Sequence, residues 1–238
     1  MRPDDDNGVI MNPARFSLAE QLVVFKEVLS RNEVLFEVLN RAAGMNLPNC
    51  YVTSGAIFQT IWNGMTGRPV EWGIRDYDLF YFDDTDTSWE AEDAVIRKGR
   101  EVFEDSTSMV EIRNQARVHL WYERKFGISC PPYESTEAAI DSFVATACSV
   151  GVRQEADRTL SVYAPYGLSD IFNMVVRPNA VQATAAVYEK KVARWLSHWP
   201  ELKVLKWPQS TLAYQVEDGR GPSTRLVGDT AHEHERVS

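Results

Sequence analysis

The chain has 238 residues, and its 25 Lys and Arg against 34 Asp and Glu give a net charge of −9. With 44% hydrophobic and 25% charged residues, it has the composition of an ordinary globular protein, which excludes disorder along the whole chain. No apolar stretch approaches the roughly 20 residues of a membrane helix, and the polar start lacks the apolar core of a signal peptide, so we expect a soluble cytoplasmic protein with no membrane partner.

The cysteines and the charge balance narrow the classes of partner. Cys50, Cys130 and Cys148 are far apart and form no CxxC pair, which argues against a disulfide framework or a structural zinc site. An extended nucleic-acid interface needs clustered Lys and Arg to replace counterions, and the acidic balance argues against one. We therefore expect small substrates rather than nucleic acid.

The chain ends and the helical periodicity predict the domain organisation. We expect a flexible lead over residues 1–15, a single domain over 16–208 and a disordered tail over 209–238. The tail holds His232 and His234, whose HxH spacing we interpret as solvated rather than as a metal site. Apolar residues at helical spacing predict a helix after Ser17, with Ser17 as its N-cap, a second helix from Asn32, and a third over 56–65.

The middle of the chain predicts two strands around a helix. The aromatic-rich segment 76–82 is interpreted as a strand, and 89–103 as a charged surface helix. Apolar and polar residues alternate from 109 to 121, which is typical of a half-buried strand because successive side chains point to opposite faces. One face of this strand would pack, and the other would carry Glu111, Arg113, Gln115, Arg117 and His119.

The last part of the chain predicts two helices, a hairpin and a short helical turn. We expect a helix over 136–143 capped by Thr136 and a hairpin of 150–154 with 160–163. We expect Asp170 to lie at the start of a short helix; the alternative is that it faces a cleft. A final helix stopped by Pro200 is lined by apolar residues at helical spacing, namely Tyr188, Val192, Trp195, Leu196 and Trp199.

Asp76 and Asp78 open the strand at 76–82 and lie on one face of it, about 6.8 Å apart at ~3.4 Å per residue. Such a pair is costly on an apolar strand unless a divalent cation neutralises it, and Mg²⁺ prefers carboxylates, waters and substrate phosphates. The alternative is a strand that starts at the surface with two solvated aspartates. Glu111 would bring a third carboxylate if its strand lies beside this one.

Ser54 and Gly55 stand between a short apolar segment and the helix over 56–65. Glycine permits close backbone approach, and free N–H groups at a helix start favour an anion. Simple capping by Ser54 is the alternative interpretation of this segment alone.

A Ser-Gly before a helix, a DxD at the start of a strand and a further acid on a later strand resemble, in this order, the nucleotidyltransferase fold of the DNA polymerase beta superfamily. The chain is more closely similar to the compact bacterial nucleotidyltransferase-like family formerly described as a domain of unknown function. The blocks that carry this resemblance span about residues 50–175 and read SGAIFQTIWNGMTG, RDYDLFYFDD, IRNQARVHLWY, ATACSVGVR and APYGLSDIF.

The resemblance implies an α+β nucleotidyltransferase-like fold, with a small mixed β-sheet flanked by helices. It implies an enzyme that uses Mg²⁺ (or Mn²⁺) to move a nucleotidyl group from an NTP to a hydroxyl of a small molecule or a protein. By the same resemblance, Asp76, Asp78 and Glu111 would hold the metal, and Glu111 would help the attacking hydroxyl lose its proton, although the superfamily usually has Asp there. The implied nucleotide-binding residues are Ser54, Gly55, Arg113, Gln115, Arg117 and His119.

Two other functions remain open at this point. The same fold can serve as a non-catalytic nucleotide-binding or partner-binding module. A glycosyltransferase also grips a metal–nucleotide complex with a DxD motif, but there the motif usually ends a strand, whereas here it opens one early in the chain.

Overall fold

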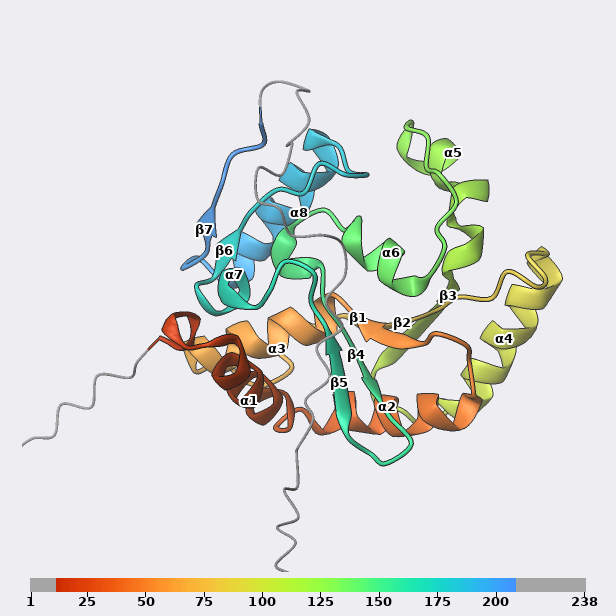
Figure 1. The fold of residues 1–238 in the computed structure, drawn as a ribbon, viewed down its shortest axis with the longest axis horizontal. Helices are drawn as coiled ribbons and strands as arrows, with labels where there is room; N and C mark the ends of the chain where they lie inside the picture. The colour runs from red at the N-terminus through yellow and green to blue at the C-terminus, as the bar shows by residue number, and fades with distance from the viewer. Residues whose placement is uncertain (1–11, 209–238) are drawn as a thin grey trace, which may run out of the picture.

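The structure is a computed structural model, and it describes residues 12–208. The predicted tail over 209–238, with His232 and His234, lies outside the described residues. The α-helices are α1 (Leu18–Leu29), α2 (Glu33–Met45), α3 (Gly55–Thr66), α4 (Trp89–Val102), α5 (Tyr122–Phe126), α6 (Thr136–Asp141), α7 (Ser169–Phe172) and α8 (Ala185–His198) (Figure 1). Three short 3₁₀ helices are η1 (Pro13–Arg15), η2 (Gln115–Leu120) and η3 (Thr146–Cys148). The strands are β1 (Tyr51–Thr53), β2 (Asp76–Tyr81), β3 (Met109–Asn114), β4 (Gly151–Gln154), β5 (Leu160–Tyr163), β6 (Val175–Val176) and β7 (Lys203–Val204).

A five-stranded mixed sheet with the order β3-β2-β1-β4-β5 is flanked by helices, which confirms the predicted fold class. β2 and β3 are parallel, and α4 supplies the crossover that a parallel pair requires. The other neighbouring strands are antiparallel. Figure 1 shows α2 on one side of the strands and α6 on the other.

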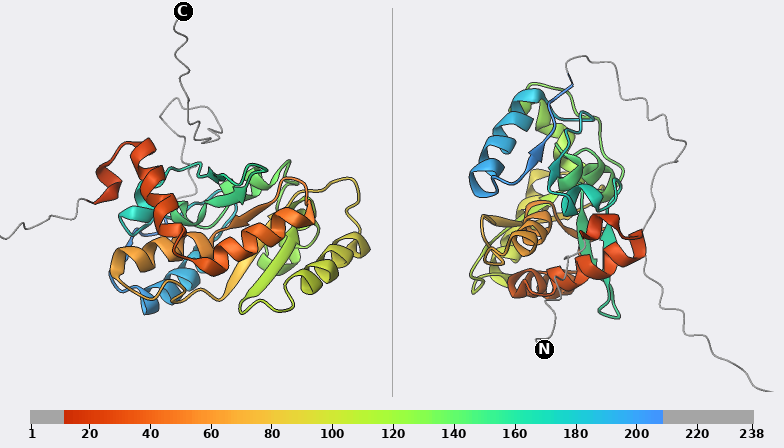
Figure 2. Two further views of the ribbon diagram at one scale, coloured as in Figure 1. Left: turned by 90° about the horizontal axis from the view of Figure 1, so that it is seen from below. Right: turned by 90° about the vertical axis from the view of Figure 1, so that its left-hand side faces the viewer.

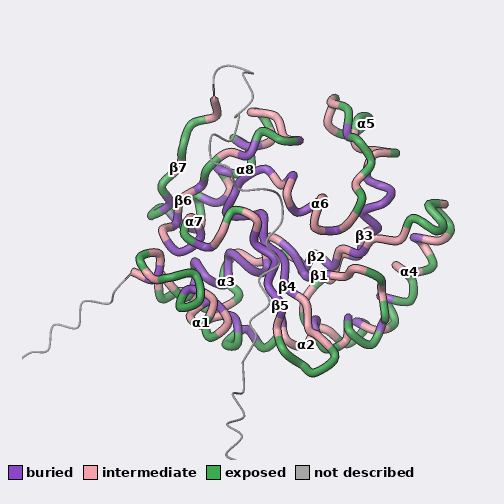
Figure 3. Tube along the Cα trace, viewed as in Figure 1, coloured by how far each residue is buried: buried purple, intermediate pink, exposed green. Residues whose placement is uncertain are grey.

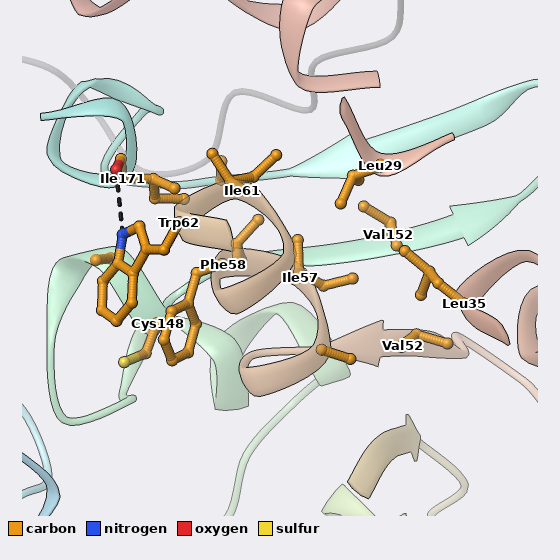
Figure 4. Close-up of a cluster of buried hydrophobic side chains, with 14 of the residues drawn as sticks. Leu29, Leu35, Val52, Ile57, Phe58, Ile61, Trp62, Cys148, Val152 and Ile171 are labelled. Atoms are coloured by element: carbon orange, nitrogen blue, oxygen red, sulfur yellow. Dashed lines mark hydrogen bonds between the residues drawn. The ribbon is translucent and has the colours of Figure 1, made fainter. Parts of the chain in front are cut away.

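The core is built around α3, which is buried along most of its length (Figure 3). The Trp62 indole donates a hydrogen bond of 3.2 Å to the Ile171 carbonyl (Figure 4), so its polar atom is satisfied inside the core. Its ring also makes edge-on contacts with Trp195 and Trp199 at centroid distances of 6.1 and 5.4 Å. These contacts fix α8 against α3, as both views of Figure 2 show.

Several elements predicted from the sequence are confirmed. Ser17 caps α1 as predicted, in a full capping box with Glu20, and the structure shows that the Asn32 side chain caps α2. β4 and β5 form the expected hairpin. Asp170 lies in the short helix α7, where it forms an ion pair with Arg177, so it is not a cleft residue.

Two predicted details are wrong. The helix over 136–143 ends at Asp141, and its cap is Ser135, whose hydroxyl accepts a hydrogen bond from the Ala138 N–H. Leu196 does not line the packed face of α8, because 37% of its surface is exposed, whereas Val192 one turn before it and the adjacent Trp195 are buried. None of the helices within residues 12–208 is both long and apolar enough to cross a membrane.

Candidate functional site

Three carboxylates share the more accessible face of the sheet. Side chains of β2 alternate between half-buried and buried, and Asp76 and Asp78 are on the half-buried face. In the parallel register of β2 and β3, Asp78 lies directly opposite Glu111. The structure therefore puts the three predicted acids on one face of two neighbouring strands.

Asp78 is an acid whose charged form is disfavoured in this structure. Burial, followed by the charges of Asp76 and Glu111, raises its pKa from 3.8 to about 7, while Lys191 and Arg113 act in the opposite direction. Neither Asp76 nor Asp78 forms an ion pair with any residue between 12 and 208. The repulsion between these carboxylates is therefore only partly offset by the protein.

Glu111 is engaged with a neighbour on its own strand. The Arg113 guanidinium lies 2.5 Å from the Glu111 carboxylate and also donates a hydrogen bond to the Ile112 carbonyl. As the side chains stand, no three Asp, Glu, His or Cys groups in the described part of the chain gather as a ready metal site. Carboxylate oxygens suit Mg²⁺, and Asp78 needs a neutralising charge, so the donor chemistry fits a divalent cation once Glu111 leaves Arg113.

The turn from β1 into α3 lies beside Asp78, because Thr53 at the end of β1 pairs with Asp78 of β2. Ser54 has a left-handed backbone, with φ of 54°, and its side chain does not cap α3. Its N–H donates to the Val150 carbonyl, and its own carbonyl accepts from Ile57 and Phe58. The N–H groups of Gly55 and Ala56 lie at the start of the helix, where no carbonyl of a preceding turn can accept from them.

Two buried polar atoms beside this turn have no partner among the described residues. Thr53 pairs with Asp78 across β1 and β2, and its Oγ1 forms no hydrogen bond. The Gln59 side chain packs against Gly55 so closely that a Cβ added to the glycine would lie 3.0 Å from the Gln59 Nε2, and its Oε1 is also unsatisfied. Buried polar atoms without partners are uncommon, and a polar ligand bound beside this turn would satisfy them.

Cationic side chains of α8 face the acids. Lys191 lines one cavity of about 200 Å³ together with Ser54 and Asp78, and Arg194 lies one turn further along the helix. Arg194 has its pKa lowered by burial and by Arg75, and the acids at 76 and 78 act in the opposite direction. Neither Lys191 nor Arg194 forms an ion pair within residues 12–208. No sequence pattern indicated these two residues, because α8 lies more than 100 residues after β2.

The predicted polar strand face is wrong beyond Asn114. The Asn114 side chain accepts from the N–H groups of Ala116 and Asp83 and donates to the Asp83 carbonyl, which ends β3 and caps η2. The chain then turns with three residues per turn, so period-two alternation no longer sorts its side chains onto two faces. Glu111 and Arg113 therefore stay on the face of the acids, and the later residues do not continue it.

The three predicted residues of η2 have different surroundings. Gln115 is buried and lines the cavity that contains Ser54 and Asp78. Arg117 is committed elsewhere, because it is buried, forms an ion pair with Glu92 and donates to the Thr87 carbonyl. His119 is not among the residues that line this cavity, and its Nδ1 is buried without a partner. Of Arg113, Arg117 and His119, which were predicted to bind the nucleotide, only Arg113 lies on the sheet face of the acids.

A larger cavity, of about 510 Å³, lies between α2 and strands β1 and β4. It contains none of the predicted site residues, so its size does not make it the candidate site.

Replacing Arg117 tests its structural role. Arg117→Met leaves the Glu92 carboxylate buried without its partner, so we expect the free energy of unfolding to fall by about 3 kcal/mol. Arg31→Met is the matched control, because its ion pair with Glu27 is exposed and should change the stability by less than about 0.5 kcal/mol. Urea denaturation measures both, and equal effects would contradict the buried role.

Replacing Asp78 tests the repulsion among the acids. Because its pKa in the folded protein is raised from 3.8 to about 7, the unfolded chain loses this proton first, and stability should fall as pH rises between about 4 and 7. Metal-free Asp78→Asn lacks this loss, and we expect it to be more stable than the parent by about 2 kcal/mol at pH 8, roughly half of the full shift because water reaches the site. Thermal unfolding across this pH range measures the difference, and parallel curves would contradict it.

Comparisons with known proteins agree with this geometry. The sequence profile of a family described as nucleotidyltransferase matches residues 40–204. A solved structure whose title states that the NMR structure of the protein reveals a CCA-adding enzyme head domain superposes with a TM-score of 0.62 at 22% identity, covering 76% of this chain and 96% of that one. A search of the curated proteins finds no match. The fold of this structure and the profile match together show that the chain belongs to the nucleotidyltransferase family.

Proposed function

We propose that this protein transfers a nucleotidyl group from an NTP to a hydroxyl of a small molecule or a protein, with Mg²⁺ (or Mn²⁺) as cofactor. The observation that carries the proposal is the register of β2 and β3, which sets Asp78 opposite Glu111 on the face that also holds Asp76. The net charge of −9 favours these acceptors over nucleic acid. The family favours this reaction over the transfer of a sugar.

Asp76 and Asp78 would hold the metal, with Glu111 as a third oxygen donor. When bound, a divalent ion would stabilise the charge that develops on the phosphate oxygens during in-line displacement. Asp78 gains most from such a cation, because its carboxylate is buried beside two other acids. Binding of the cation favours the ionised form of Asp78 and so removes the repulsion described above.

Glu111 is placed to accept the proton of the attacking hydroxyl. As this proton leaves, the hydroxyl oxygen bonds to the α-phosphorus, and the bond to the pyrophosphate leaving group breaks. Arg113 holds the Glu111 carboxylate at 2.5 Å and so fixes its position until the substrate arrives. The guanidinium that is then released carries a positive charge on the same sheet face, close to the transferred phosphate.

The phosphates of the NTP would lie between α3 and α8. The N–H groups of Gly55 and Ala56 and the unpartnered Thr53 hydroxyl can donate hydrogen bonds to phosphate oxygens on one side. Lys191 and Arg194 supply positive charge on the other side, where no carboxylate of residues 12–208 forms an ion pair with them. In this arrangement the two cations would lie against the leaving pyrophosphate.

The acids should separate binding from turnover. We expect Asp76→Ala to abolish Mg²⁺-dependent NTP binding, because it removes one of the two donors on β2. Glu111→Gln should keep NTP binding within about threefold and lower turnover by at least about 100-fold, because it removes the proton acceptor. Calorimetry with each NTP and Mg²⁺ measures binding, and product formation in an acceptor screen measures turnover.

Two results would overturn this assignment. Unchanged NTP affinity in Asp76→Ala would show that the acids do not hold the nucleotide. NTP binding without any product in the parent protein, across a broad acceptor screen, would favour the non-catalytic binding module instead.

Lys191 should contribute to phosphate binding. We expect Lys191→Gln to weaken both Mg²⁺–NTP and Mg²⁺–tripolyphosphate binding by about tenfold, since a charge-assisted hydrogen bond contributes roughly 1.5 kcal/mol. Lys190→Gln is the matched control, because both lysines are exposed and carry the same charge, whereas Lys190 does not line the cavity. Equal losses in the two variants would indicate only a general effect of net charge and would contradict the specific contact.

A further inference from the structure

The cavity that contains Asp78 extends from the acids into an aromatic enclosure. Its lining includes Ser54, Asp78 and Lys191, which the proposed function assigns to phosphate and metal. The same cavity is lined by apolar and aromatic side chains from β2, η2, α5 and the segments beside them, namely Phe80, Val118, Trp121, Tyr122, Phe126, Tyr133 and Phe143. Its volume of about 200 Å³ is well above the ~30 Å³ share of one water molecule.

The aromatic side chains of α5 form one wall of this enclosure. The Tyr122 and Phe126 rings have centroids 4.6 Å apart, and the Trp121 ring lies 6.5 Å from that of Phe126. All three are half-buried, although α5 has only five residues and cannot cover them by itself. Phe80 and Phe143, which also line the cavity, meet edge-on at 6.0 Å. The Lys125 ammonium lies over the Trp121 and Phe126 rings, 5.2 and 5.3 Å from their centroids, so a planar ligand would stack on the opposite faces of these two rings.

The enclosure also offers polar atoms that can contact the edge of such a ring. The Gln115 Nε2 donates to the Arg113 carbonyl at 3.3 Å, and no hydrogen bond from residues 12–208 reaches its Oε1. Tyr133 and Ser142 are joined hydroxyl to hydroxyl at 2.6 Å, and Ser142 donates onward to the Ala139 carbonyl, so the Tyr133 hydroxyl is the donor between them. The Gln115 Oε1 is therefore the hydrogen-bond acceptor that this polar group offers to a ligand in the cavity.

We propose that this enclosure binds the base of the NTP, by stacking on the aromatic wall of α5 and by contact with Gln115. The proposal rests on the proposed function. An aromatic acceptor is the other ring that would fit, but the cavity favours the base for a structural reason. Ser54 and Lys191, which the proposed function assigns to the phosphates, line the same cavity. Glu111, which would receive the proton of the acceptor, does not line it.

The test compares ligands with and without a base. Calorimetry measures the binding of each of the four NTPs and of tripolyphosphate, all with Mg²⁺, to the full chain and to Trp121→Ala and Phe126→Ala. The parent should bind at least one NTP more tightly than tripolyphosphate. Each variant should weaken that NTP by about tenfold and leave tripolyphosphate unchanged, because stacking on an aromatic side chain is lost while the phosphate contacts remain.

Trp89→Ala is the matched control, since Trp89 is also a tryptophan at the start of a helix, is 63% exposed, and lies outside the cavity. It should bind both ligands as the parent does. Circular dichroism of each variant establishes that it is folded, and Gln115→Leu provides a second route, because it should change the preference among the four NTPs.

The remaining outcomes each overturn a separate claim. If the parent binds NTP and tripolyphosphate equally, the base does not enter the enclosure, while the proposed function stands. The same holds if Trp121→Ala and Phe126→Ala keep their NTP affinity but need more acceptor for turnover, which would give the enclosure to the acceptor. If the parent binds neither ligand, the proposed function fails, and the assignment of the base fails with it.

Discussion

The parallel pairing of β2 with β3 is the constraint on which the rest of the site depends. It places Asp78 beside Glu111, with Asp76 on the same face, and so collects negative charge where burial already disfavours it. The buried core around α3 holds this arrangement, because Trp62 packs against Trp195 of α8 and donates a hydrogen bond to the Ile171 carbonyl of α7. Stability built in the core thus offsets repulsion at the site, a relation common where a protein must bind a charged ligand.

Basic side chains from two different elements lie near these acids. Arg113 lies on the sheet beside Glu111, while Lys191 and Arg194 approach from α8, and neither α8 cation is neutralised by an ion pair within residues 12–208. Such an arrangement suits a ligand that brings a divalent cation for the acids and phosphates for the basic side chains. A metal–nucleotide complex carries both, which explains how one site can satisfy two opposite sets of charges.

The local features of this site could be predicted from the sequence. The contribution of residues far along the chain, such as Lys191 on α8, could not. The alternation around Asp76 and Asp78 identified a strand face, and the resemblance to a family connected it with Glu111. The same alternation failed after Asn114, because a side chain that caps a 3₁₀ helix changes the period without changing the apolar pattern. Lys191 had no local signal at all, since a lysine on an amphipathic helix is ordinarily a solvated residue and only tertiary packing brings it to the acids.

The most direct test of the central claim is a crystal structure of the protein with Mg²⁺ and a non-hydrolysable NTP. The account predicts a metal ion bound by the carboxylates of Asp76 and Asp78, with the Glu111 carboxylate turned from Arg113 towards it. An ion bound elsewhere, or a Glu111 that stays paired with Arg113 while the nucleotide lies outside this face of the sheet, would contradict it.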